Sequence, residues 1–377
     1  MACKIFSFFS GAGFLDLGFE KSGYQVVFAN EISKEFAHGY RYAREKMGMP
    51  LPKYGLHEED VCTYLPNMAK GLFPSTLDEL QAQVDAERQD GSMVGFIGGP
   101  PCPDFSVAGK NKGAEGKHGV LSQVYMDLIC TVRPDFFLFE NVKGLWRTAK
   151  HKQFFDTLVQ QAKKNGYYVT YRLVNALEYG APQDRDRILM FGVKESFLPK
   201  GDEQNTMMSF PWVDKGSSVD AIKKRQWPGV TPFCTRQTKA PDDVLEKLTV
   251  EYWFKKNDVE HHPNAGDYFQ PKAALKKMAT IDEGDVSRKA YKRLHRWRYS
   301  PTVAYGNNEV HWHPYKQRRL SAAEALSLQS LPKEFQLPPD MTLSAKFKTI
   351  GNGVPYLLAK SIAERMYTFL SHLKPHE

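Results

Sequence analysis

Short apolar runs alternate with longer amphipathic stretches along the first half of the chain. Apolar runs of roughly four to eight residues are typical of buried strands, whereas stretches of roughly 12 or more are typical of helices. The apolar runs lie at 5–9, 24–29, 94–97, 136–139, 167–174 and 188–193, and the helix-length stretches include 34–47, 121–132 and 152–165. Strands that alternate with helices form a mostly parallel sheet with helices on both faces. The pattern therefore predicts an α/β fold.

The regular alternation ends after residue 193. Lys, Trp, Pro and Gly then become frequent and the periodicity weakens, which indicates a smaller, irregular domain. Further on, Ser321-Ala-Ala-Glu324 is a capping-box pattern that predicts the start of a helix, and 357–370 fits a final helix. We expect a first domain at 1–194, an irregular domain at 195–310, and a segment at 311–377 that returns to the first domain.

The composition is that of an ordinary globular protein, with 42% hydrophobic and 25% charged residues. No apolar run approaches the roughly 18 residues that a membrane-spanning helix needs. Residues 1–6 resemble the start of a core strand and lack the features of a secretory signal. The five cysteines are scattered and never paired at metal-ligand spacing, which predicts a reducing compartment, no disulfide framework and no metal site.

The positive charge is concentrated in one segment. The net charge is +8 and the pI about 9.0. Residues 215–319 hold 21 Lys and Arg against 12 Asp and Glu, so the rest of the chain is close to neutral. A basic segment is expected where a protein grips phosphates, although many basic proteins bind no polyanion.

A glycine-containing turn follows the first predicted strand. In Phe9-Ser-Gly11-Ala-Gly13-Phe14 the glycines let a ligand approach the backbone, and the helix that follows would attract an anionic group. Glu31 ends the second strand, where nucleotide-binding sheets place a carboxylate for ribose hydroxyls. Asp60 and Val61 could bind the amino group and the ring of an adenine. A tight turn without a ligand and a solvated loop Asp remain the alternatives.

The strand at 94–97 leads into a turn rich in proline, Gly98-Gly-Pro-Pro-Cys102-Pro103. Because open α/β sheets bind ligands at the carboxyl ends of their strands, Cys102 is expected at the active edge. A thiolate there can act as a nucleophile if nearby cations or dipoles lower its pKa. A buried structural cysteine is the alternative.

Polar groups also flank the next two apolar strands. Glu140 ends the strand at 136–139 and could form a hydrogen bond with a ring nitrogen. Arg185 and Arg187 precede the strand at 188–193, and side chains at i and i+2 point the same way in an extended chain. They could neutralise a thiolate, a phosphate or a base carbonyl. Taken alone, these three residues would fit a structural ion pair equally well.

Together these segments resemble, in order, the sequence blocks of DNA (cytosine-5) methyltransferases of the bacterial restriction-modification type. The resemblance covers nearly the whole chain. The matching segments are 9–13, Glu31, Asp60-Val61, Pro101-Cys102, 140–142, Gln183-x-Arg185-x-Arg187, 319–321 with Glu324 and 328–329, and 351–355. The chain departs at Pro103, where the family usually has Gln. The departure leaves the behaviour of the loop open, but not the nucleophile.

The resemblance implies a Rossmann-like S-adenosylmethionine-dependent methyltransferase domain and a target-recognition domain at 195–310. It implies that Cys102 attacks C6 of a flipped-out cytosine while Glu140 contacts N3. It also implies that Arg187 binds the base carbonyl and that Arg185 favours the thiolate or holds a phosphate. The residues implied to bind the cofactor are Phe9, Gly11, Ala12, Gly13, Phe14, Glu31, Asp60, Val61, Pro101 and Asn352. The residues expected to contact DNA are Ser106, Lys110, Arg225, Arg236, Arg296, Arg298 and Thr302.

The implied partner is double-stranded DNA, bound by a monomer in the bacterial cytoplasm without a membrane and near the nucleoid. S-adenosylhomocysteine would be the product of the cofactor, and no metal is implied. An RNA cytosine methyltransferase is the nearest alternative, but a large basic recognition domain favours duplex DNA. A catalytically inactive DNA-binding protein is disfavoured by the intact Cys102 and Glu140. A nicotinamide enzyme is disfavoured because Asp16 stands where its third glycine would be.

Overall fold

The fold is seen in a computed structural model. It describes residues 2–65, 76–101, 119–214, 218–236, 239–270, 275–288, 290–306 and 309–373. Cys102, Pro103, Ser106 and Lys110 therefore lie outside the described residues. No helix in the described ranges is both long enough and apolar enough to cross a membrane.

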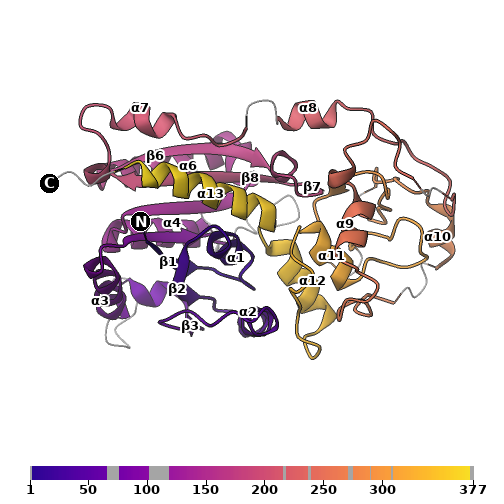
Figure 1. Cartoon of the computed structure of the whole chain (residues 1–377), viewed down its shortest axis with the longest axis horizontal. Helices are drawn as coiled ribbons and strands as arrows, with labels where there is room; N and C mark the ends of the chain where they lie inside the picture. The colour runs from indigo at the N-terminus through magenta and orange to yellow at the C-terminus, as the bar shows by residue number, and fades with distance from the viewer. Residues whose placement is uncertain are drawn as a thin grey trace.

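A seven-stranded sheet forms the centre of the larger part of the molecule (Figure 1). Its strands, in spatial order, are β3 (Leu56–His57), β2 (Gln25–Asn30), β1 (Cys3–Phe8), β4 (Met93–Gly98), β5 (Phe136–Val142), β8 (Asp186–Lys194) and β6 (Tyr167–Asn175). β8 runs antiparallel to both of its neighbours, and the other pairings are parallel. The predicted α/β fold with a mostly parallel sheet is confirmed.

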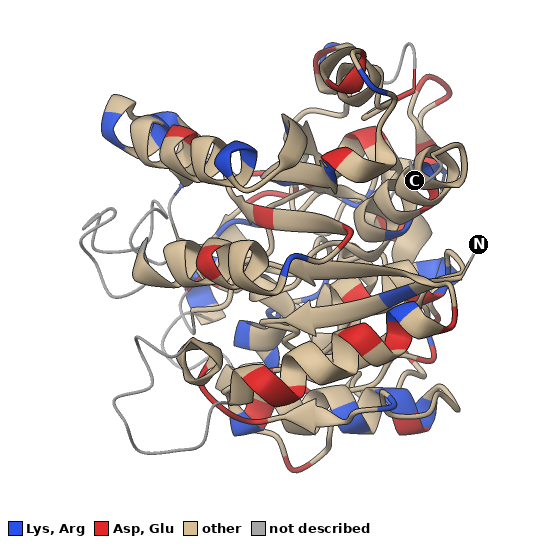
Figure 2. Ribbon diagram, turned by 90° about the vertical axis from the view of Figure 1, so that its left-hand side faces the viewer, with Lys and Arg blue, Asp and Glu red and all other residues tan. Residues whose placement is uncertain are grey.

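Helices cover both faces of the sheet. One apolar cluster joins the sheet to α3 (Thr76–Gln89), α4 (Gly119–Val132) and α6 (Ala149–Lys164). The cluster on the opposite face joins it to α1 (Phe14–Glu20), α7 (Glu203–Met208) and α13 (Tyr356–Ser371). Since both faces are buried, strands such as β4 are apolar throughout rather than alternating. Figure 2 shows the charged residues mainly on the helices and loops around the sheet.

The second part of the molecule, at the right of Figure 1, has little regular structure. Its helices are short: α8 (Val219–Lys223), η5 (Glu246–Leu248), α9 (Val250–Lys256) and α10 (Leu275–Thr280). At the end of this second part, β9 (Ser300–Pro301) pairs in parallel with β7 (Gln183–Asp184). Hydrogen bonds from buried polar side chains, rather than a sheet, connect its segments. The guanidinium of Arg293, for example, donates to the carbonyl oxygens of Ile281, at 2.8 Å, and His313, at 2.6 Å.

The C-terminal segment folds back through α11 (Ala322–Leu328) and α12 (Leu343–Asn352) to α13, which packs on α1. The predicted capping box is present, since Ser321 Oγ accepts from Glu324 N and Glu324 Oε2 accepts from Ser321 N. A Cβ on Gly18 would lie 2.5 Å from that of Ala359, so only glycine allows α1 and α13 to pack this closely.

The apolar core around the sheet includes residues beyond the predicted boundary at 194. Phe210 and Trp212 lie in the cluster that covers the second face of the sheet. The domain boundaries at 194 and 310 stay a prediction. The remaining helices are α2 (Lys34–Lys46) and the short α5 (Gly144–Arg147), η1 (Val61–Tyr64), η3 (Ala176–Tyr179) and η4 (Glu195–Phe197).

Candidate active site

The carboxyl ends of the parallel strands meet at one edge of the sheet. The chain builds the sheet outward from β1 through β2 to β3, then returns to add β4 and β5 on the other side of β1. The crevice at such a reversal is where open α/β sheets bind ligands. The candidate residues that follow β1, β2, β4 and β5 all emerge at this edge.

The turn after β1 has the backbone of a ligand-binding loop. Gly11 and Gly13 have φ values of 57° and 84°, in the left-handed region that glycine adopts freely, and Phe9 has a φ of 54°. A Cβ on Gly13 would lie 2.9 Å from the ring of Tyr40, whereas the space beside Gly11 is open. The turn is therefore closed by packing on one side and accessible at Gly11.

Glu31 faces this turn from the end of β2. One of its carboxylate oxygens accepts from Gly11 N at 2.9 Å, and the other accepts from Ser33 N at 2.8 Å. Burial raises the pKa of Glu31, and the two backbone N–H groups offset this in part. The bonds fix the carboxylate against the glycine turn.

Ile32 was not among the residues predicted from the sequence. Its side chain directly follows Glu31 and is 60% exposed. An isoleucine this exposed beside the Glu31 carboxylate is available to pack on an apolar ring. Its signal in the sequence is only its position, one residue after the carboxylate that ends β2.

The predicted cofactor residues further along the chain differ in how exposed they are. Asp60 is exposed and caps η1, accepting from Cys62 N at 2.9 Å, while Val61 is buried in the core of the sheet. Asn352 is exposed at the end of α12. A Cβ on the following residue, Gly353, would lie 2.1 Å from the ring of Phe14. Close packing thus brings the C-terminal turn to the start of α1.

At the end of β4 the chain reaches Pro101, which is exposed and is the last described residue before Cys102. Asn141 Nδ2 donates to the carbonyl oxygen of Pro100 at 3.3 Å, and so joins the exit of β4 to β5. A Cβ on Gly99 would lie 2.5 Å from Glu140 Oε2. The glycine therefore makes room for the Glu140 carboxylate directly beside the segment that leads to Cys102.

Glu140 and Arg187 form the central pair of the site. Arg187 Nε lies 2.6 Å from Glu140 Oε1, in an ionic contact without the alignment of a hydrogen bond, and each residue is 7% exposed. They meet because β8 is antiparallel: its first residues, among them Arg187, lie opposite the last residues of β5. Arg187 also donates from Nη1 to the carbonyl oxygen of Asp186 at 2.8 Å.

Arg185 occupies a different environment. It is 1% exposed, and its Nη2 donates to the carbonyl oxygens of Gly351, at 2.7 Å, and Gly353, at 3.0 Å. Burial lowers the pKa of Arg185, and the two carbonyl oxygens compensate its charge. In this structure Arg185 holds the turn that carries Asn352, a contact with the C-terminal segment that the sequence did not indicate.

Two buried amides extend this contact into a network, here called the Gln183 network. Gln183 Nε2 donates to Leu328 O at 3.1 Å and to Gln329 Oε1 at 3.2 Å, and its Oε1 accepts from Val303 N at 3.0 Å. Gln329 in turn donates to the carbonyl oxygen of Ile350. Together with Arg185, these bonds connect the segment that leaves the irregular part to the turn at 351–353.

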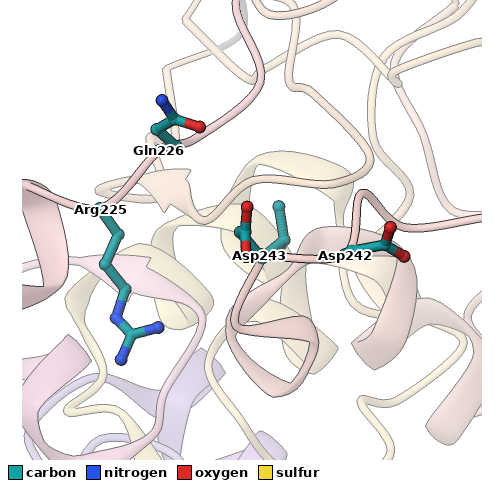
Figure 3. Close-up of a pocket in the computed structure, with 5 residues that line it drawn as sticks. Arg225, Gln226, Asp242 and Asp243 are labelled. Carbon is teal, nitrogen blue, oxygen red and sulfur yellow. The ribbon is translucent and has the colours of Figure 1, made fainter.

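The residues predicted to contact DNA lie in unlike surroundings. Arg225 lines a hollow with Gln226, Asp242, Asp243 and Val244. Figure 3 shows Arg225 and Gln226 on one side of it and the two aspartates on the other.

Of the others, Arg236 is exposed, and Arg298 is half-buried with its guanidinium 5.7 Å from the centre of the Tyr299 ring. Arg296 is buried in an ion pair with Glu283 at 2.8 Å. Thr302 is exposed and donates to Asp184 O at 2.7 Å. The ion pair gives Arg296 a structural partner inside the protein.

Two buried histidines follow directly after the irregular part, His311 and His313. Burial lowers the pKa of His311 to about 3, and His313 Nε2 lies 3.4 Å from Glu324 Oε1. Among the described residues, no three His, Cys, Asp or Glu side chains are grouped so that they could hold a metal ion.

Comparison with known proteins gives a family match. The family model described as C-5 cytosine-specific DNA methylase matches residues 3–53 and 73–368. The Type II methyltransferase M.NmeDI of Neisseria meningitidis serogroup C is 53% identical over 98% of this chain and 84% of its own length. The Type II methyltransferase M.FnuDI of Fusobacterium nucleatum is 27% identical over 96% of this chain and 94% of its own length.

Solved structures agree in fold. A prophage-encoded DNA modification methyltransferase from E. coli superposes with a TM-score of 0.62 at 22% identity, covering 99% of this chain and 100% of its own. DNMT2 of Spodoptera frugiperda superposes with a TM-score of 0.56 at 14% identity, covering 98% and 100%. At these identities the likeness establishes the fold.

Proposed function

Since the chain belongs to the C-5 cytosine-specific DNA methylase family, we propose that it methylates C5 of a flipped-out cytosine in duplex DNA through a covalent bond from Cys102. DNA cytosine-5 methylation follows from the family. The covalent route and the residue roles below are the proposal. The observation that carries them is the Glu140–Arg187 pair beside the strand exit that leads to Cys102.

The glycine turn fits S-adenosylmethionine. The fixed carboxylate of Glu31 suits the ribose hydroxyls, the exposed Ile32 suits the adenine ring, and Asp60 suits its amino group. Asn352 would close the site from the C-terminal turn. When bound, S-adenosylmethionine supplies an electrophilic methyl group.

The remaining chemistry falls to the protein. C5 of cytosine is a poor nucleophile, and it is hidden within the base stack, so the base must leave the duplex. Addition of the Cys102 thiolate to C6 places electron density on C5, which can then take the methyl group. Loss of the C5 proton returns the electron pair to the ring and expels Cys102 as thiolate. The cycle thus leaves 5-methylcytosine and a regenerated nucleophile.

Glu140 and Arg187 would hold the base during these steps. We assign Glu140 to a hydrogen bond with N3 and Arg187 to the base carbonyl, because the two side chains emerge together at the carboxyl end of β5. Their ion pair holds both side chains in place before the base arrives, which reduces the entropy lost on binding. Arg185 is a positioning residue in this scheme, because it grips the turn at 351–353.

The irregular part is proposed as the target-recognition domain. It holds the surplus of positive charge, and arginines such as Arg225 and Arg236 can contact phosphates or guanine edges. Because the relatives M.NmeDI and M.FnuDI are Type II methyltransferases, a role as the modification enzyme of a restriction-modification system is favoured. We further propose that the enzyme acts as a monomer.

A methyl-transfer assay with radiolabelled S-adenosylmethionine tests the substrate class. We expect label to enter double-stranded DNA and not tRNA, and bisulfite sequencing of the DNA should place every modified cytosine within one short sequence. Incorporation into tRNA alone would refute the assignment to DNA.

A further inference from the structure

Arg187 lies at the very start of its strand, where the pairing of the sheet ends. β8 begins at Asp186, which pairs only with Asn175, the last residue of β6. Arg187 pairs with Val142, which is the last residue of β5. The chain that leads into Arg187 therefore lies beyond the seven-stranded sheet, and side-chain bonds are needed to fix it.

Asn175 supplies such bonds from a buried position. It is 1% exposed, and its Nδ2 donates to Asp184 Oδ1 at 2.7 Å and to Asp186 Oδ1 at 2.8 Å. Its Oδ1 accepts from Leu177 N at 3.0 Å and so caps η3. Both N–H groups of the amide thus bond to the two carboxylates that flank Arg185.

These bonds hold together two groups of like charge. Side chains at i and i+2 of an extended chain point the same way. Asp184 and Asp186 accordingly both face Asn175, whereas Arg185 faces the turn at 351–353. An amide that donates to both carboxylates offsets their mutual repulsion and fixes the spacing of the segment between them.

Lysines bind the outer oxygens of the same carboxylates. Lys143 Nζ lies 2.8 Å from Asp186 Oδ2, and Lys223 Nζ lies 2.7 Å from Asp184 Oδ2. The side chains of Lys143 and Lys223 are 55% and 37% exposed, and ion pairs this open to solvent contribute little to stability. The buried amide of Asn175 is therefore the contact that fixes both carboxylates most firmly.

Asp186 in turn holds the guanidinium of Arg187. Arg187 Nη1 donates to Asp186 O at 2.8 Å, and Arg187 Nε lies 2.6 Å from Glu140 Oε1. Arg187 Nη2 makes no hydrogen bond to any residue within the described ranges, so it is available for the base carbonyl of the proposed function. A chain of contacts thus runs from Asn175 through Asp186 to Arg187.

A role as helix cap would not by itself require an amide at position 175. Asn, Asp and Ser are similar N-caps, because each offers a side-chain oxygen to a backbone N–H. Among these three, only asparagine adds two N–H donors. Both donors of Asn175 are used at the start of β8 rather than in η3.

We propose that Asn175 is a positioning residue for methylation: it fixes the start of β8 so that Arg187 meets the carbonyl of the target cytosine. This proposal rests on the proposed function, which gives Arg187 that contact with the base. Asn175 acts through Asp186 and Arg187 and not on the cofactor, because the turn at 351–353 is held separately by Arg185 and the Gln183 network. Its loss should therefore slow the reaction of DNA without weakening cofactor binding.

The test is a double-mutant cycle between Asn175 and Arg187. Asn175→Asp keeps the cap of η3 but removes both donated bonds. We expect it to lower the single-turnover rate of DNA methylation on the order of 10²-fold, as small misplacements do. The affinity for S-adenosylhomocysteine, measured by calorimetry, should not change. In an Arg187→Gln background the same substitution should lower the rate by less than about twofold, because a residue that acts through Arg187 then has nothing to position.

Asn264→Asp is the matched control. Asn264 is buried, donates to Asp267 Oδ2 at 2.8 Å and to Leu337 O at 3.0 Å, and accepts from Leu337 N at 2.9 Å. The substitution therefore also places a carboxylate beside an aspartate and removes two donated bonds. We expect a comparable loss of stability in urea unfolding and an unchanged methylation rate in both backgrounds.

The outcomes separate this proposal from the proposed function. An unchanged rate in Asn175→Asp, or an equal loss with and without Arg187, would overturn the positioning role, as would weaker binding of S-adenosylhomocysteine that matches the loss of rate. If Asn175→Asp does not fold, Asp186→Ala breaks the same contact from a half-buried position, and the same dependence on Arg187 is expected. A wild-type rate in Arg187→Gln alone would instead refute the contact between Arg187 and the base, and with it this proposal.

Discussion

At the scale of single residues, a buried carboxyl group lies under the glycine turn. Asp16 is 0% exposed, in the first turn of α1, and accepts from Ser7 Oγ at 2.6 Å and from Tyr40 OH at 3.0 Å. Burial raises the pKa of Asp16 to about 6. The ring of Tyr40 also packs against Gly13. The protonation of Asp16 is therefore coupled to the packing beneath the candidate cofactor loop.

This coupling predicts a pH-dependent stability. Because the pKa of Asp16 is higher in the folded than in the unfolded chain, its stabilising contribution is full at about pH 4 and is lost as the pH rises to about 6. The rise of the Asp16 pKa from its ordinary value of 3.8 to about 6 corresponds to roughly 3 kcal/mol. We expect the stability of Asp16→Asn, relative to the wild type, to improve by up to that amount from pH 4.5 to 7.5. Urea unfolding at each pH measures it, and a difference that does not change with pH would contradict the account.

Residue patterns in the sequence singled out Glu140, Arg185 and Arg187, with an ion pair between Glu140 and the arginines as one alternative, but left their geometry open. The apolar run before Glu140 indicated a strand end, and the run after Arg187 indicated a strand start. Nothing in either run gives the direction of β8, and only its antiparallel course brings the two side chains to 2.6 Å. The burial of Arg185 could not be predicted from the sequence either, because its carbonyl partners lie more than 160 residues further along the chain.

At the scale of elements, the Gln183 network joins three segments that the sequence keeps far apart. β7 pairs with β9 at the exit of the irregular part, and Gln183 on β7 bonds to the end of α11 and to Val303. Gln329 and Arg185 then hold the turn after α12. The position of Asn352 relative to β8 therefore depends on buried polar bonds rather than on apolar packing alone.

A substitution that breaks this network should lower catalytic activity by more than the loss of folding stability explains. Gln183→Leu removes two donated bonds and leaves Val303 N without its partner, which costs about 1–3 kcal/mol for a buried donor. If the turn at 351–353 holds the cofactor as proposed, its displacement should lower kcat/KM for S-adenosylmethionine on the order of 10²-fold, as small misplacements do. Steady-state kinetics at a temperature where the variant is fully folded measures this.

Asn264 offers a matched control. This buried amide donates to Asp267 at 2.8 Å and Leu337 O at 3.0 Å, and accepts from Leu337 N at 2.9 Å, so like Gln183 it donates two bonds and accepts one from a backbone N–H, but away from the site. We expect Asn264→Leu to lose comparable stability and to keep its kcat/KM. Equal losses of activity in both variants would contradict this prediction and show that the Gln183 network has only a structural role.

At the scale of the whole molecule, regular and irregular parts differ in how far the sequence predicted them. The sheet and its helices were predicted because each strand buries its own apolar run. The irregular part was predicted only as irregular, since contacts such as those of Arg293 with Ile281 and His313 join residues 12 and 20 positions apart without a periodic signal. A third apolar cluster connects α1 and α2 with α9, α11 and α12, which makes the two parts a continuous structure.

The whole enzyme must bring DNA, cofactor and nucleophile to one edge of the sheet. Trapping with 5-fluorocytosine tests this most directly, because fluorine at C5 cannot leave as the proton does and the thiolate cannot then be expelled. With S-adenosylmethionine and a target duplex that contains 5-fluorocytosine, the wild type should form an adduct that survives denaturing electrophoresis. Cys102→Ser should form none. An adduct that persists in Cys102→Ser, or its absence from a wild type that methylates the normal duplex, would contradict the covalent route from Cys102.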